Sequence, residues 1–372
     1  MRTFKIEPLH VPSMEACRLR IDNLTKPIYS LATLETIAER FAGILRNSKP
    51  NHLRYGVLVV AADHLVDGPQ NTEHGSESYD AIECFNEGTT ATQGAAAKLN
   101  AVVHVVNLGL EQDTADLANI EQQVIRKGSH FFGVEPAISR EELERALELG
   151  FTYADRLHAD GLQVVAIGNV GERAFLDSLV TTATITGCAY EDILVHNEYG
   201  PTVEQRAAHI HSFVDRFNIA VDDWSTLSES ERHDAVLNLL HVAGGLDIAF
   251  LTAFILGAVS HRMAVVFDNV VTGAAILAAV TINPLVKDYV FPSAVYDEPI
   301  HDEPIHKEQC RFLGVKPYLY YNLLIDEALG STMGLSIIDA SMHMLNDMKT
   351  FIEAEVSVAE DGAGKGRQKD KE

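Results

Sequence analysis

The sequence predicts an α/β fold in which a parallel sheet carries helices on both faces, and three observations support this. Several apolar runs are nearly continuous rather than alternating, which is typical of strands buried on both faces. Each run is followed by small or polar residues and then by a helix-like segment, the order expected of a parallel sheet. The chain has 372 residues, 47% of them hydrophobic, so it can bury a large core. Together these features predict a Rossmann-like sheet.

The first predicted element is a helix over residues 31–45, where apolar side chains recur at helical spacing. It follows an N-terminal arm that we expect to be extended, and Pro27 and Ser30 provide start signals for the helix. The predicted strands then follow at residues 55–62, 101–109, 162–169 and 263–269.

Polar and small residues stand at the carboxyl ends of these strands. Ligands bind beyond the carboxyl ends of parallel strands, so these residues are the first candidates for a site. They are Ala62, Asp63, His64, Asn107, Leu108, Gly109, Gly168, Asn169, Asp268 and Asn269.

No linker divides the interior of the chain, so we expect one α/β core domain at residues 51–335. A small helical domain is expected to form from the chain ends. It takes the arm and helix within residues 1–50 and a C-terminal helix at residues 336–352. Residues 353–372 lose aromatic side chains and periodicity, which predicts a disordered tail.

Charge and hydropathy argue against several classes of protein. The formal net charge is −24 and no Lys/Arg cluster stands out, so binding to nucleic acid is not expected. The longest apolar runs are too short or are interrupted by Asp268 and Asn269, so no membrane span is predicted. The N-terminus lacks the apolar segment of a signal peptide, which favours a cytoplasmic location.

Some residues suggest metal binding, but other interpretations are favoured. His64 has no partner at ligand spacing and is interpreted as a polar strand end. The pentapeptide DEPIH occurs at residues 297–301 and again at 302–306, and a tandem duplication in a Pro-bearing loop explains it without a ligand. Four cysteines lie too far apart for a metal or redox motif and are expected to be reduced core residues. These are Cys17, Cys84, Cys188 and Cys310. We therefore expect no metal and no cofactor.

A series of segments between Ile21 and Phe351 carries a specific pattern, although each segment alone is weak. The segments are IDNLTKPIYSLATLETIAERFAG, VVAADH, EGTTATQGAAAKLNAVVHVVNLG, RKGSHFFGVEPAISREE, VAGGLDIAFLTAFILGAV, VFDNVVTGAAILAA and KPYLYYNLLIDEALGSTMGLSIIDA. In this order they resemble the nicotinate-nucleotide:dimethylbenzimidazole phosphoribosyltransferases, which activate the lower-ligand base of cobamides.

The resemblance implies transfer of the phosphoribosyl group of nicotinate mononucleotide to an aromatic base. It places Glu327 on the family's catalytic glutamate, a general base that takes the acceptor's proton. A partly apolar pocket would raise the pKa of such a carboxylate toward neutrality. The residues alone leave open that Glu327 caps the following helix, and the resemblance favours catalysis. The implied substrate-binding positions are Gly168, Asn169, Gly171, Gly244, Gly245, Thr272, Thr89 and Thr90.

Departures from the family pattern leave a second hypothesis open. Asn169 stands where the family has an acid, and residues 174–176 replace a polar triplet. Asp326 and Ala328 replace the glycines that flank Glu327. The resemblance implies a homodimer or a heterodimer with a paralogue, and the acceptor base stays open. The alternative to an active enzyme is a catalytically impaired structural or regulatory subunit paired with an active paralogue.

Overall fold

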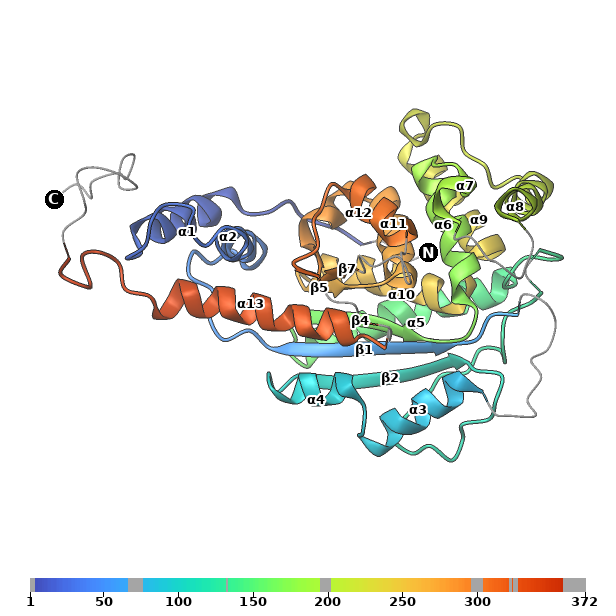
Figure 1. Cartoon of the computed structure of the whole chain (residues 1–372), viewed down its shortest axis with the longest axis horizontal. Coiled ribbons are helices and arrows are strands. Elements are labelled where there is room, and N and C mark those ends of the chain that lie inside the picture. The colour runs from blue at the N-terminus through green and yellow to red at the C-terminus, as the bar shows by residue number, and fades with distance from the viewer. Residues whose placement is uncertain are drawn as a thin grey trace.

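The computed structural model describes residues 4–65, 76–131, 133–194, 202–295, 304–320, 323 and 327–356. Its main feature is a parallel 6-stranded sheet in the order β3-β2-β1-β4-β5-β6 (Figure 1). The strands are β1 (Tyr55–Ala62), β2 (Val102–Gly109), β3 (Glu121–Gln122), β4 (Val164–Val170), β5 (Ala264–Phe267) and β6 (Val290–Pro292). A second pair joins β7 (Ala294–Val295) and β8 (Leu319–Tyr320). The predicted parallel sheet is confirmed.

The strand order reverses direction between β1 and β4. From β1 the chain proceeds outward through β2 and β3, whereas β4, β5 and β6 extend the sheet on the other side. Such a switch point opens a crevice at the carboxyl ends of the two central strands. Both strands are buried along their whole length, which explains their continuous apolar sequences.

Helices cover both faces of the sheet, as predicted. On one face α13 packs against β4 and β5, and α4 packs against β2 and α13. On the other face α10 packs against β1, β2 and β5, and α5 covers α10 (Figure 1). The helices of the sheet layers are α3 (Glu77–Glu87), α4 (Ala91–Ala97), α5 (Arg140–Ala159), α6 (Ala174–Thr186), α9 (Glu229–Ala243), α10 (Gly245–Ser260), α11 (Val270–Ile282) and α13 (Leu329–Asp347).

The remaining helices are peripheral or belong to the chain ends. They are α1 (Val11–Asn23), α2 (Thr33–Leu45), α7 (Tyr190–Ile193), α8 (Val203–Phe217), η2 (Trp224–Thr226), η3 (Pro284–Tyr289) and α12 (Pro304–Leu313). In the described part of the chain, no helix is both long enough and apolar enough to cross a membrane.

The two ends of the chain meet beside the sheet. Helix α1 packs on α2, and α2 packs on α13 (Figure 1). Leu24 forms an antiparallel bridge with Thr350, and Phe351 N donates to Asn23 O at 3.0 Å. Helix α13 runs without a break past residue 335. The boundaries expected for the two domains stay predictions, and residues 357–372 of the expected tail lie outside the described residues.

The structure corrects several local predictions. The N-terminal arm is not extended throughout, because residues 11–23 form α1. Its buried positions are Ser13, Cys17 and Ile21, and this narrow stripe of mostly small side chains hid the helical period. Helix α2 begins at Thr33, and Ala32 rather than Ser30 occupies its N-cap.

Two further expectations about single residues also need correction. Cys84 is exposed, so it is not a core residue, whereas Cys17 and Cys310 are buried and Cys188 is half-buried. The second DEPIH copy is not entirely a loop, because α12 begins at Pro304 and buries His306. The first copy lies outside the described residues.

Candidate active site

Asp63 organises the loops at the carboxyl end of β1. Its Oδ1 accepts from Ser78 Oγ at 2.7 Å and from Glu172 N at 3.1 Å. Its Oδ2 accepts from Glu111 N at 2.9 Å. One buried carboxylate therefore joins the segments that follow β1, β2 and β4.

His64 lies next to Asp63 and is buried between two acids. Its Nδ1 bonds Asp177 Oδ2 on α6, and its Nε2 lies 3.1 Å from Asp247 Oδ2 at the start of α10. All three side chains are at most 1% exposed. The partners are 113 and 183 residues away in sequence, so spacing along the chain could not reveal them.

The charges of this cluster shift the proton affinity of its members. Burial by itself would lower the pKa of His64, but the carboxylates of Asp247 and Asp177 raise it well above its ordinary value of 6.5. Burial raises the pKa of Asp177, and its pairing with His64 opposes that shift. Both shifts go upward, so the folded cluster retains protons that the separate groups would release.

Gly245 brings α10 close to the imidazole. Its φ is +63°, in the left-handed region that favours glycine, and a Cβ at this position would overlap His64 Cε1. Gly244 ends α9 and is the N-cap of α10. On the opposite side, His64 N donates to Glu172 O at 3.0 Å. The turn at Gly245 therefore contacts the ring of His64, and the turn at residues 171–172 contacts its main chain.

Glu327 lies in a strained turn immediately before α13. Both Glu327 and Ala328 have positive φ, at 34° and 61°, which is unfavourable for residues with a Cβ. The turn is held from two sides. Thr92 Oγ1 on α4 donates to Glu327 O at 2.7 Å, and Ala328 packs on Gly168 so closely that a Cβ at Gly168 would overlap it.

The start of α13 is fixed by residues from neighbouring strands. Ser331 N donates to Asp268 Oδ2 at 2.8 Å, and Ser331 Oγ donates to Ile167 O at 2.8 Å. Ser293 Oγ donates to Gly330 O at 2.5 Å. The N-cap residue Ala328 makes no side-chain cap, so Asp268 serves the first turn in its place.

The ends of β4 and β5 are joined by an amide pair. Asn269 Nδ2 donates to Asn169 Oδ1 at 2.9 Å, and both side chains are buried. Asn269 is also the N-cap of α11, where its Oδ1 accepts from Thr272 N at 2.9 Å. Asn169 and Thr272 are thus engaged in structural hydrogen bonds of their own.

The structure brings several of the sequence-derived candidates to the carboxyl edge of the sheet, but no hydrogen bond joins Thr89 to them in the described part of the chain. Gly168 contacts the Glu327 turn, Asn169 and Thr272 share Asn269, and Gly171 and Gly245 flank the His64 cluster. Thr90 is the N-cap of α4, the helix that contacts Glu327 through Thr92, whereas Thr89 Oγ1 donates to Cys84 O at 3.1 Å.

Sequence reasoning missed Thr92, Asp177 and Asp247. Thr92 lay inside a recognised motif, but only the fold shows that it reaches Glu327. Among the described residues, no cluster of three or more His, Cys, Asp or Glu side chains is arranged to hold a metal ion.

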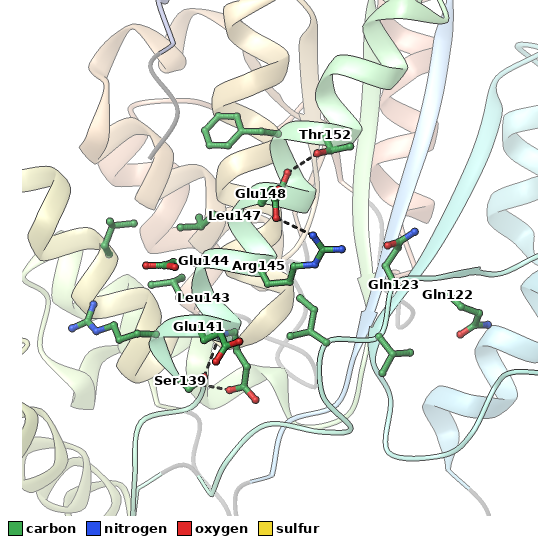
Figure 2. Close-up of a pocket in the computed structure, with 16 residues that line it drawn as sticks. Gln122, Gln123, Ser139, Glu141, Leu143, Glu144, Arg145, Leu147, Glu148 and Thr152 are labelled. Atoms are coloured by element: carbon green, nitrogen blue, oxygen red, sulfur yellow. Dashed lines mark hydrogen bonds and ion pairs between the residues drawn. The ribbon is translucent and has the colours of Figure 1, made fainter.

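A separate groove lies between the N-terminal half of α5 and residues 122–125 (Figure 2). Leu143, Leu147 and Phe151 are among its lining residues, and Arg145 and Glu148 form an ion pair at its rim at 2.8 Å. Neither Glu327 nor any of the implied substrate-binding positions lines this groove, so it is not the candidate active site.

Comparisons with known proteins show what the whole chain is similar to. A family model described as phosphoribosyltransferase matches residues 6–356. A nicotinate-nucleotide–dimethylbenzimidazole phosphoribosyltransferase from a Geobacter species is 29% identical, and the match covers 95% of this chain and 97% of that protein. The enzyme of the same name from Chloroflexus aggregans is 30% identical, with coverages of 95% and 96%. A crystal structure of the Thermus thermophilus enzyme is 26% identical with a TM-score of 0.79, covering 94% of this chain and 99% of that one.

Proposed function

The chain belongs to the phosphoribosyltransferase family, and from this premise we propose that it transfers the phosphoribosyl group of nicotinate mononucleotide to an aromatic lower-ligand base. The products are an α-riboside 5′-phosphate and nicotinate. The observation that carries the proposal is the turn that holds Glu327 at the carboxyl edge of the sheet, against Gly168 and α4.

The proposed reaction is a displacement at the anomeric carbon of the ribose. A nitrogen or oxygen of the acceptor base forms the new bond to this carbon. The bond to the nicotinate nitrogen breaks, and its electron pair neutralises the pyridinium ring. The acceptor's proton passes to the carboxylate of Glu327, which acts as the general base. Nicotinate is a good leaving group because it departs from a positively charged pyridinium.

The local structure favours catalysis over helix capping for Glu327. The first turn of α13 is already served by Asp268, which accepts from Ser331 N. A turn with two successive positive φ values costs free energy that a simple helix start does not require. Strain of this kind, held in place by contacts from α4 and β4, is typical of residues whose position matters for function.

We place the nucleotide along the carboxyl ends of β1, β4 and β5. In this proposal Gly168, Gly171, Gly244 and Gly245 allow close approach of the backbone, and Asn169, Thr272, Thr89 and Thr90 complete the surroundings. Backbone N–H groups at helix starts suit a phosphate even in a chain of net charge −24. The partner is a second copy or a paralogue.

One observation favours a second candidate, a catalytically impaired subunit paired with an active paralogue. Asn169 lies where the family has an acid, and its Oδ1 is already engaged by Asn269 Nδ2. Asn169 carries no charge and its amide oxygen already accepts a hydrogen bond, so it would not contribute a carboxylate to the substrate as the family's acid does.

The test is an assay of nicotinate release. The purified chain is incubated with nicotinate mononucleotide and a panel of benzimidazoles, purines and phenols, alone and with any family-like protein encoded nearby. Base-dependent release of nicotinate by the chain alone supports the proposal. Release only in the presence of the partner supports a heterodimer. No release in any combination would rule out the proposed phosphoribosyltransferase activity.

A further inference from the structure

The cluster of His64, Asp177 and Asp247 occupies the space between the two glycine turns of the candidate site. His64 extends from the end of β1, Asp177 belongs to α6 after β4, and Asp247 belongs to the first turn of α10. These three elements are distant in sequence, and the family-matched glycines Gly171, Gly244 and Gly245 lie at the turns before α6 and α10. The cluster is therefore the point at which the turns are held relative to each other.

Close packing fixes the position of His64 relative to the Gly245 turn and to residue 172. Gly245 approaches His64 Cε1 so closely that any Cβ would overlap the ring. His64 N donates to Glu172 O at 3.0 Å, immediately after Gly171. A displacement of the imidazole would press directly on the Gly245 turn. It would reach the turn at residues 171–172 through the main chain of His64 and through Asp177 at the start of α6.

Among the described residues, the hydrogen bonds and close contacts of the Glu327 turn come from elements other than this cluster. That turn is held by Thr92, by Gly168, and by the bonds of Asp268 and Ser293 to the first turn of α13. Loosening the His64 cluster should consequently move the glycine turns and leave the general base in place.

We propose that His64, clamped between Asp177 and Asp247, is a positioning residue that sets the affinity of the site for nicotinate mononucleotide. This inference rests on the proposed function, because it assigns the two glycine turns to the nucleotide. His64 does not touch the reacting atoms in this proposal. It acts through the backbone of residues 171–172 and 244–245.

The variants Asp177→Asn and Asp247→Asn test the proposal, because each keeps the shape of the side chain and removes one charge from the clamp. Asp177 Oδ1 has no hydrogen-bond partner among the described residues, so an amide at this position can keep its bond to His64. Tyr55→Phe is the matched control. It removes a hydrogen bond of 3.0 Å to Asp339 at the opposite end of the same strand, β1.

The readouts are KM and kcat for nicotinate mononucleotide, with Kd from calorimetric titration. Both Asn variants should raise KM and Kd roughly 10-fold to 100-fold while kcat stays within about 3-fold, as expected when binding geometry alone is disturbed. The Tyr55→Phe protein should bind like the wild type. A fall in kcat with unchanged KM, or unchanged binding in both Asn variants, would overturn the positioning role. Failure of both variants to fold would also overturn it in favour of a purely structural role.

The wild-type titration separates this inference from the proposed function. If the wild type neither binds nor turns over nicotinate mononucleotide, alone or with its partner, the proposed function fails and the inference fails with it. If the wild type binds the nucleotide and the Asn variants bind it equally well, only the inference fails. If the wild type binds without turnover, the Kd comparison still decides the positioning role.

Discussion

At the carboxyl edge of the sheet, the polar groups buried beyond β1 are stabilised differently from those buried beyond β4 and β5. At β1 a charged cluster is completely buried, with an imidazole between two carboxylates. At β4 and β5 the buried groups are the amide pair of Asn169 and Asn269 and the carboxylate of Asp268, which accepts from the main chain of Ser331 rather than from a cation. Glu327 lies nearby in a half-buried, strained turn. The β1 side holds the backbone of several loops together, and in the proposed function the β4–β5 side carries the general base Glu327.

The largest expected effect is the loss of activity in Glu327→Gln. This change keeps the shape and removes the basicity, so turnover should fall by roughly 10²-fold to 10⁴-fold with little change in the free energy of unfolding. The measurements are nicotinate release and thermal unfolding on the most active assembly. A protein that turns over normally but melts at a lower temperature would assign Glu327 to the helix start and break the proposed division of roles.

The next largest effect is expected on the free energy of unfolding when the buried His64 cluster is disrupted. His64→Leu leaves Asp177 and Asp247 buried without their cation, and removal of one partner from a buried ion pair costs about 3–5 kcal/mol. Denaturant unfolding measures this loss. The neighbouring carboxylates of Asp63 and Glu172 accept hydrogen bonds from Glu111 N and Ser76 Oγ. The substitution removes neither of these two bonds. A loss below about 1 kcal/mol would show that the cluster contributes little net stability.

The same cluster predicts a pH dependence with a definite sign. The folded pKa of His64 is raised above its ordinary 6.5, so its stabilising contribution is fully present below about pH 6.5. The contribution is lost as the pH rises through the raised folded value. Unfolding free energies of wild type and His64→Leu should therefore converge as the pH increases above neutrality, and a constant difference across that range would contradict the pKa shift.

The sequence predicted the scaffold more completely than the site, and particular residues show why. The strands at residues 55–62 and 162–169 were visible because burial on both faces requires continuous apolar sequence. His64 was interpreted as a polar strand end because its partners, Asp177 and Asp247, are brought to it only by the fold. Strands β3 and β6 span two and three residues, too few to show a period.

The next prediction concerns the close contact between Gly168 on β4 and Ala328, next to Glu327. Gly168→Ala places a Cβ against the backbone and side chain of Ala328, and overpacking of this kind costs about 1–3 kcal/mol. The double variant Gly168→Ala with Ala328→Gly should recover part of that loss. It removes the Ala328 Cβ and relieves the positive φ of 61°, while N and Cα of residue 328 stay in the way. Denaturant unfolding of both single variants and the double variant gives the coupling, and strict additivity would mean that the two residues do not touch.

The smallest expected effect measures the neutral amide pair itself. Asn269→Ala removes the N-cap of α11 and leaves Asn169 Oδ1 without its donor, which should cost about 1–2 kcal/mol. Ser228→Ala is the matched control, because Ser228 caps α9 with the same capping box but has no strand-end partner. Asn269 is buried and Ser228 is exposed, so the difference between the two unfolding free energies gives the combined contribution of the Asn269–Asn169 bond and of burial. Equal losses would mean that this bond adds nothing beyond the cap, and that the β4–β5 side is held by the start of α13 alone.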